Sequence, residues 1–114
     1  MNRVVLIGVL ACPVELRELS MGRTIGKTII AVSRGTDVGT DWIGLTLWDR
    51  QAINAARYLG QGSQVAVQGR LHGAYRTAWA DDGTKRTRRT VEVVVDRITY
   101  LSPRPPAGGR GGRS

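Results

Sequence analysis

The sequence predicts an all-β protein, and three observations lead to that class. Five stretches of apolar residues either run continuously or alternate with polar residues, as strands do. Only one short stretch between them has helical spacing, and glycine-containing turns separate the others. The 114 residues fit one domain, which at this size buries a core without disulfides. The five stretches are residues 4–10, 24–34, 42–48, 65–71 and 91–95.

The first predicted strand, residues 4–10, is apolar at both odd and even positions. Side chains alternate between the two faces of a strand, so we expect both of its faces to be covered. Gly22 marks a turn before the second predicted strand, residues 24–34. Gly35 and Gly39 then mark a loop that leads into the third.

The third predicted strand, residues 42–48, carries different side chains on its two faces. The aliphatic residues that we expect in the core are Ile43, Leu45 and Leu47. The opposite face has two tryptophans separated by small residues: Trp42, Gly44, Thr46 and Trp48.

A short helix follows, because the spacing of the apolar residues changes to three and four. Asp49 is placed to cap its start, and Gly60 ends it. The residues expected on its buried face are Ala52, Ile53, Ala56 and Leu59. Strand alternation then returns at residues 65–71, and Asp82-Gly83 predicts a hairpin turn. Residues 91–95 form the last strand, which residues 98–101 extend or follow.

Three strands, one helix and a long β-hairpin, in this order, predict an OB-fold. This is a five-stranded Greek-key barrel with one short helix between strands 3 and 4. An SH3-like barrel is the main alternative, but it does not normally place a helix there. We expect the barrel to span residues 1–101. Residues 102–114 are rich in Pro, Gly and Arg and nearly free of apolar side chains, so we expect a disordered tail.

The sequence offers little for catalysis or metal binding. It has one histidine, His72, and one cysteine, Cys12, and no metal-ligand spacing. We therefore expect no enzyme, no catalytic residue, no metal and no cofactor. No apolar run approaches the ~18 residues of a spanning helix, so we expect no membrane segment. A single cysteine excludes an intramolecular disulfide and favours a cytoplasmic, nucleoid-associated protein.

The charge favours a polyanionic partner. Lys and Arg number 17 against 9 Asp and Glu, so the formal net charge is +8. Proteins that bind single strands combine a basic groove with aromatic side chains on which bases stack. The residues expected to stack on single-stranded DNA are Trp42, Trp48, Trp79 and Tyr75. The hairpin cations expected to hold phosphates are Arg76, Lys85, Arg86, Arg88 and Arg89.

Two simpler interpretations compete with this one. The tryptophans of the third strand could pack beneath loops, since Trp is usually well buried. The basic hairpin could be an ordinary solvated hairpin. The two features together favour DNA binding more than either does alone.

Several segments resemble the bacterial single-stranded-DNA-binding protein family, in order and with few gaps: residues 2–8, 15–17, 58–65, 69–71 and 91–95. The resemblance implies an OB-fold subunit, usually a homotetramer, around which single-stranded DNA wraps. It places stacking aromatics at Trp42 and Trp48, a third on the hairpin (Trp79 rather than Tyr75), and cations at Arg3 and Arg50.

The chain also departs from the family pattern. Ile43 stands where a polar residue often takes part in assembly, and no acidic residue follows Asp96. Typical members end in an acidic tip that recruits other proteins, so we expect no recruitment by that route and a resemblance to short paralogues lacking the tip. A homo-oligomer would pair through the edge of the first strand. The alternatives are an OB-fold adaptor of replication restart and an RNA-binding protein.

Overall fold

The computed structural model describes residues 1–35 and 38–102, apart from the side chains of Ala74, Arg76 and Ala78. The predicted tail, residues 102–114, therefore lies outside the described residues from position 103 onward. The elements are β1 (Val4–Leu10), β2 (Glu15–Glu18), the 3-10 turn η1 (Ser20–Gly22), β3 (Thr24–Ser33), β4 (Thr40–Trp48), α1 (Asp49–Tyr58), β5 (Gln64–Trp79) and β6 (Lys85–Tyr100). No helix in this part of the chain is long and apolar enough to cross a membrane.

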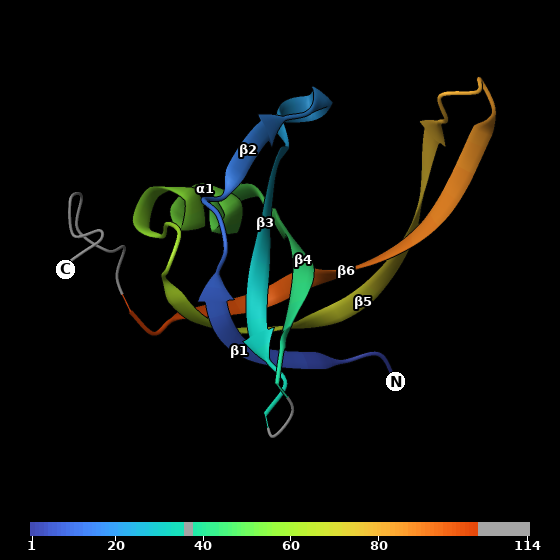
Figure 1. The fold of residues 1–114 in the computed structure, drawn as a ribbon. Helices are drawn as coiled ribbons and strands as arrows, with labels where there is room; N and C mark the ends of the chain where they lie inside the picture. The colour runs from blue at the N-terminus through green and yellow to red at the C-terminus, as the bar shows by residue number, and fades with distance from the viewer. Residues whose placement is uncertain (36–37, 103–114) are drawn as a thin grey trace.

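Five of the strands close into a barrel (Figure 1). They follow one another as β1-β5-β6-β4-β3, and β1 returns to pair with β3 through Val9 and Leu10. Among the described pairings β4–β6 is parallel and the rest are antiparallel. The predicted OB-fold is confirmed, with α1 between the third and fourth barrel strands. The sequence did not indicate β2, which extends the free edge of β3.

The core fills the barrel and extends to α1. The expected inward face of β4 is confirmed, since Leu45 and Leu47 are fully buried and Ile43 packs against them. On α1 the buried residues are Ala52 and Ala55, and Leu59 follows them into the core. Ile53, expected on that face, is exposed instead. The helix packs closely on β3 at Gly26. A Cβ atom at this position would lie 2.9 Å from side-chain carbons of both Ala52 and Val14, so there is no room for a side chain.

The strands of the long hairpin carry a β-bulge between Gln68 and Gly69, next to the β6 residues Glu92–Val94 that pair with β4 in the barrel. A Cβ atom at Gly69 would collide with the carbonyl oxygen of Val94, so only glycine fits this close approach. Bulges bend a strand and increase its twist. From this point β5 and β6 remain paired as far as Trp79 and Lys85, and their ends project from the barrel (Figure 1).

The predicted hairpin turn is confirmed at Asp82-Gly83. The Gly83 amide donates to the Ala80 carbonyl oxygen over 2.9 Å, and Gly83 adopts a φ of 85°. Three residues connect the paired positions Ala80 and Thr84, which is the three-residue loop with glycine in the left-handed region. The loop length sets which residues of β5 and β6 face one another.

The expectation that both faces of β1 are covered is wrong within this chain. Val4 and Leu6 pack against the core, whereas Val5 and Ile7 on the outer face are 60% and 57% exposed. Val9, also on that face, is exposed as well. Helix α1 lies elsewhere, against β3, β4 and β2, so no described element covers the outer face of β1.

Candidate nucleic-acid interface

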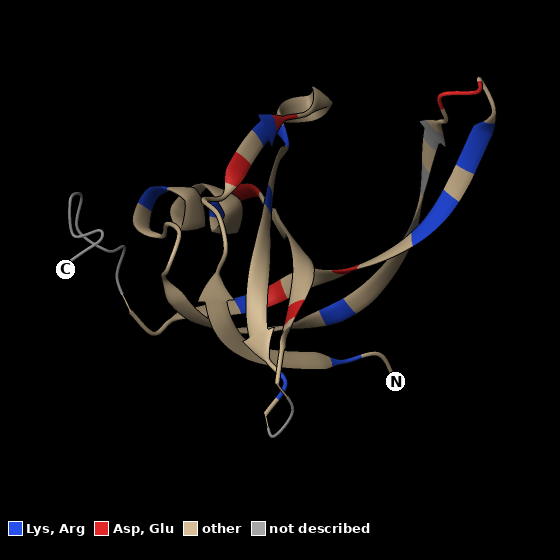
Figure 2. Cartoon of the chain, in the orientation of Figure 1, with Lys and Arg blue, Asp and Glu red and all other residues tan. Residues whose placement is uncertain are grey.

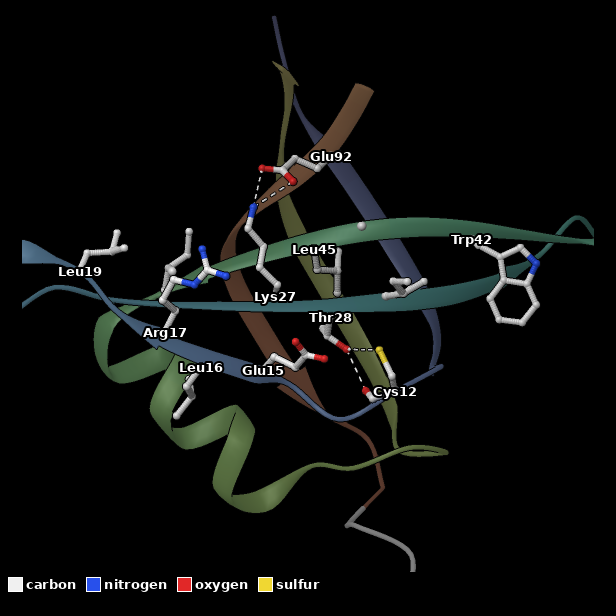
Figure 3. A pocket seen from close by; sticks show the side chains of 13 residues that line it. Cys12, Glu15, Leu16, Arg17, Leu19, Lys27, Thr28, Trp42, Leu45 and Glu92 are labelled. Atoms are coloured by element: carbon white, nitrogen blue, oxygen red, sulfur yellow. Dashed lines mark hydrogen bonds and ion pairs between the residues drawn. The ribbon is translucent and has the colours of Figure 1, made fainter. Parts of the chain in front are cut away.

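An open groove of about 620 Å³ lies over the outer face of β3 and β4 and against β2 (Figure 3). The alternation of β3 produces its floor, because Ile25, Lys27 and Ile29 share one face of that strand. Leu16 and Leu19 contribute apolar surface from the β2 side. The groove is therefore partly apolar, as a surface that accepts flat rings must be.

Trp42 lies at one end of this groove (Figure 3). It is 66% exposed, so it does not pack beneath a loop. Its partner across the strands is Ala31, a small residue that leaves the indole uncovered. Trp42 thus presents the open ring that base stacking requires.

Trp48 lies on the same strand in different surroundings. It is half-buried, and the Arg23 guanidinium carbon lies 4.8 Å from its ring centroid. This is a cation–π contact that occupies one face of the indole. The two tryptophans that the sequence placed on one strand face are therefore not equivalent platforms.

Asp49 holds Arg23 in place rather than capping α1. Its carboxylate accepts hydrogen bonds from Arg23 Nε, at 2.9 and 3.1 Å, and from the Thr24 amide at 3.1 Å. These hydrogen bonds hold the pKa of Asp49 below its ordinary 3.8. The predicted capping role is wrong, because Asp49 has a φ of 54° and no side-chain cap bond forms at this helix end.

The groove floor is less bare than the sequence indicated. Lys27 Nζ donates to both carboxylate oxygens of Glu92, at 3.0 and 3.1 Å (Figure 3). It also donates to Thr46 Oγ1 at 2.8 Å. Thr46, one of the small residues expected between the two tryptophans on the outer face, is buried. Burial raises the pKa of Glu92, but hydrogen bonds from Lys27 and Thr46 outweigh burial and hold this pKa below 4.5.

The groove has no net formal charge. Two cations, Arg17 and Lys27, and two anions, Glu15 and Glu92, line it. None of the cations predicted to hold phosphates is among its lining residues. Arg3 is exposed just before β1, Arg50 is exposed on α1, and the others belong to the hairpin.

The hairpin divides its aromatic and basic residues between two faces. Paired residues share a face, so Tyr75 and Trp79 lie with their partners Arg89 and Lys85. Tyr75 and Trp79 are 69% and 72% exposed. The opposite face carries Arg86 and Arg88, and the side chain of Arg76 lies outside the described residues. Figure 2 shows the basic positions along the β6 arm.

Sequence reasoning missed four residues around these sites: Arg17, Arg23, Lys27 and Glu92. A signal existed for Lys27, which stands between Ile25 and Ile29 in an alternating strand and so belongs to its outer face. No local pattern marks Arg23, because its position depends on Asp49, 26 residues away.

A closed five-stranded barrel with a groove and an exposed aromatic ring on its outer face defines an OB-fold protein of the nucleic-acid-binding type. This chain belongs to the single-strand binding protein family, which matches residues 1–101. The resemblance found in the sequence is thereby confirmed.

Curated relatives agree with this assignment. The chain is 32% identical to a single-stranded DNA-binding protein of Treponema pallidum, over 88% of this chain and 57% of the relative. It is 35% identical to a Bacillus cereus protein of the same name, over 98% of this chain and 66% of the relative. The chain is also 30% identical to single-stranded DNA-binding protein B of Bacillus subtilis, over 91% of this chain and 93% of the relative. The chain thus spans less than two thirds of the length of the first two relatives.

Proposed function

We propose that this protein binds single-stranded DNA without sequence preference and organises it during replication, recombination or repair. The observation that carries the proposal is Trp42, an indole two-thirds exposed at the end of an open groove. Every base has a π-face, so stacking on such a ring does not depend on base identity. Membership of the single-strand binding protein family supports the same function.

Bases stack on Trp42 in the groove and on Trp79 or Tyr75 of the hairpin. The groove itself is neutral, so phosphates find their cations at its margins. The hairpin supplies Lys85 and Arg89 beside its aromatic rings and Arg86 and Arg88 behind them. Arg3 and Arg50 hold further phosphates, and no metal or catalytic residue takes part.

A fluorescence titration tests this function. The protein has three tryptophans, and oligo-dT should quench their emission as bases stack. Trp42→Ala should weaken binding, whereas Tyr100→Ala, which truncates an exposed aromatic at the end of β6 and outside the groove, should not. Unquenched emission at saturating oligo-dT would contradict the proposal. Displacement of oligo-dT by equimolar oligo-U would favour an RNA-binding protein instead.

The same proposal includes a homo-oligomer, with a tetramer favoured. In the described structure the pairing of β1 with β3 begins only at Val9, so residues 4–8 offer an unpaired edge opposite β5. Val5 and Ile7 expose apolar surface beside this edge. An open, apolar edge strand readily pairs with another chain.

The mass in solution, with and without oligo-dT of graded length, tests assembly and footprint together. We expect a mass several times that of one 12.4 kDa chain. Ile7→Glu should lower it, because it places a charge in the proposed interface. Glu18→Lys, a charge change at an exposed position on β2 that does not line the groove, is the control. A wild-type monomer would contradict the oligomer.

A further inference from the structure

A second hollow of about 630 Å³ lies beside the groove, between η1, the start of β3 and α1. Its cations are Arg23, Arg50 and Arg57, and its one anion is Asp49. In contrast to the neutral groove, this hollow therefore has a positive formal charge. Arg50 and Arg57 form no ion pair with any described residue, so neither charge is neutralised. The Arg57 guanidinium carbon lies 5.9 Å from the Tyr58 ring centroid, a contact that leaves the charge available to an anion.

The cations of α1 follow from helix geometry. Arg50, Asn54 and Arg57 are separated by four and three residues, which places them on one face. The same face carries Ile53, and the buried residues Ala52 and Ala55 point the other way. Arg50 and Arg57 are about 10 Å apart along the axis, at 1.5 Å per residue. Figure 2 shows the basic positions of this helix.

The hollow begins where the β3–β4 surface reaches Trp48. Ile25, which lines the groove, is paired with Trp48, and the preceding residue, Thr24, lines the hollow. Arg23 connects the two, because it covers Trp48 and also lines the hollow. Its Nε is bound by Asp49, so the two terminal nitrogens of its guanidinium remain for an oxyanion.

We propose that single-stranded DNA leaving the groove near Trp48 continues over the outer face of α1, where Arg23, Arg50 and Arg57 hold its phosphates. This path rests on the proposed function and adds to it a route that the exposed aromatics alone do not define. It also supplies cations at the end of the groove opposite Trp42, far from the basic hairpin.

The chemistry of the hollow favours a nucleic-acid backbone over an acidic protein segment. Protein partners are usually anchored by an aromatic or aliphatic side chain in a desolvated pocket. Ile53 is the only large apolar side chain among the residues that line this hollow, and it is exposed. Phosphate contacts need only cations and polar donors, which Arg50, Asn54 and Arg57 provide.

The test measures oligo-dT affinity against salt for Arg57→Gln, with Arg97→Gln as the control. Both changes remove one exposed positive charge, and Arg97 lines neither the groove nor the hollow. Each phosphate contact contributes about 0.7 to the slope of log K against log salt. With long oligo-dT, Arg57→Gln should lower this slope by about 0.7, and Arg97→Gln should leave it unchanged. With the shortest oligomer that quenches Trp42, neither variant should differ from the wild type.

Three results would overturn the path. One is an unchanged slope for Arg57→Gln on long oligo-dT, and another is an equal loss for Arg97→Gln, which would indicate only net charge. The third is an oligo-aspartate peptide that binds the wild type but not Arg57→Gln while the DNA slope is unaffected. In each case wild-type quenching by oligo-dT would leave the proposed function intact, and its absence would refute that function separately.

Discussion

Arg23 covers one face of the Trp48 indole, with 4.8 Å between the guanidinium carbon and the ring centroid. Asp49 fixes this arrangement through Arg23 Nε, and the Thr24 amide fixes Asp49. One face of Trp48 is therefore already stacked in the absence of DNA. Trp42 on the same strand has no such cation–π contact with any described residue.

This difference predicts unequal effects of the two truncations on DNA binding. Trp42→Ala should weaken oligo-dT binding by about 1–3 kcal/mol, the range for loss of one stacked base. Trp48→Ala should cost less affinity, because Arg23 competes for its ring, and more stability, because the ring is half-buried. Fluorescence titration and urea unfolding measure the two effects. A larger loss of affinity for Trp48→Ala would contradict the assignment.

The hairpin predicts a change in affinity without a change in stability. Trp79 is exposed and lies beyond the barrel, so Trp79→Ala should shift the free energy of unfolding by no more than about 0.5 kcal/mol. If Trp79 stacks on a base, the same change should weaken oligo-dT binding by about 1–3 kcal/mol. Thr77→Ala, on the same face, is the control. Normal binding by Trp79→Ala would leave Tyr75 as the hairpin platform.

The barrel strands and the helix could be predicted because their signals are local. Alternation at residues 42–48 and the Asp82-Gly83 turn each identify an element without reference to the rest of the chain. β2 could not be predicted in this way. All four of its residues, Glu15–Glu18, are exposed, so it has no alternating pattern and forms through its pairing with β3.

The site was predicted less completely because its geometry depends on long-range pairing. Lys27 and Glu92, which bond across the groove, are 65 residues apart in the chain. The separation of Arg86 and Arg88 from Tyr75 and Trp79 follows from the hairpin register. Composition shows that these cations exist, but only the register shows which face each occupies.

The bulge predicts a specific cost of adding one methyl group. Gly69→Ala should destabilise the protein by about 1–3 kcal/mol, as overpacking does, because its Cβ would meet the backbone oxygen of Val94. Gly73→Ala on the same strand is the control, since a Cβ there meets no atom within 4 Å. Urea unfolding of the two variants checks this. Equal stability of the two would show that the bulge relaxes freely.

The Lys27–Glu92 pair predicts an acid-sensitive contribution to stability. The folded-state pKa of Glu92 lies below 4.5, its ordinary value and the one expected in the unfolded chain. The contribution is therefore complete above that value and is lost as the pH falls through the lower folded-state pKa. Both side chains are partly exposed, so we expect the pair to contribute less than about 1 kcal/mol to the free energy of unfolding.

Asp49 and Asp82 also have lowered pKa values, so the measurement must isolate Glu92. The difference in unfolding free energy between the wild type and Glu92→Gln should shrink as the pH falls from about 6 to about 3. A difference that is constant over this range would show that the ion pair contributes nothing to folding.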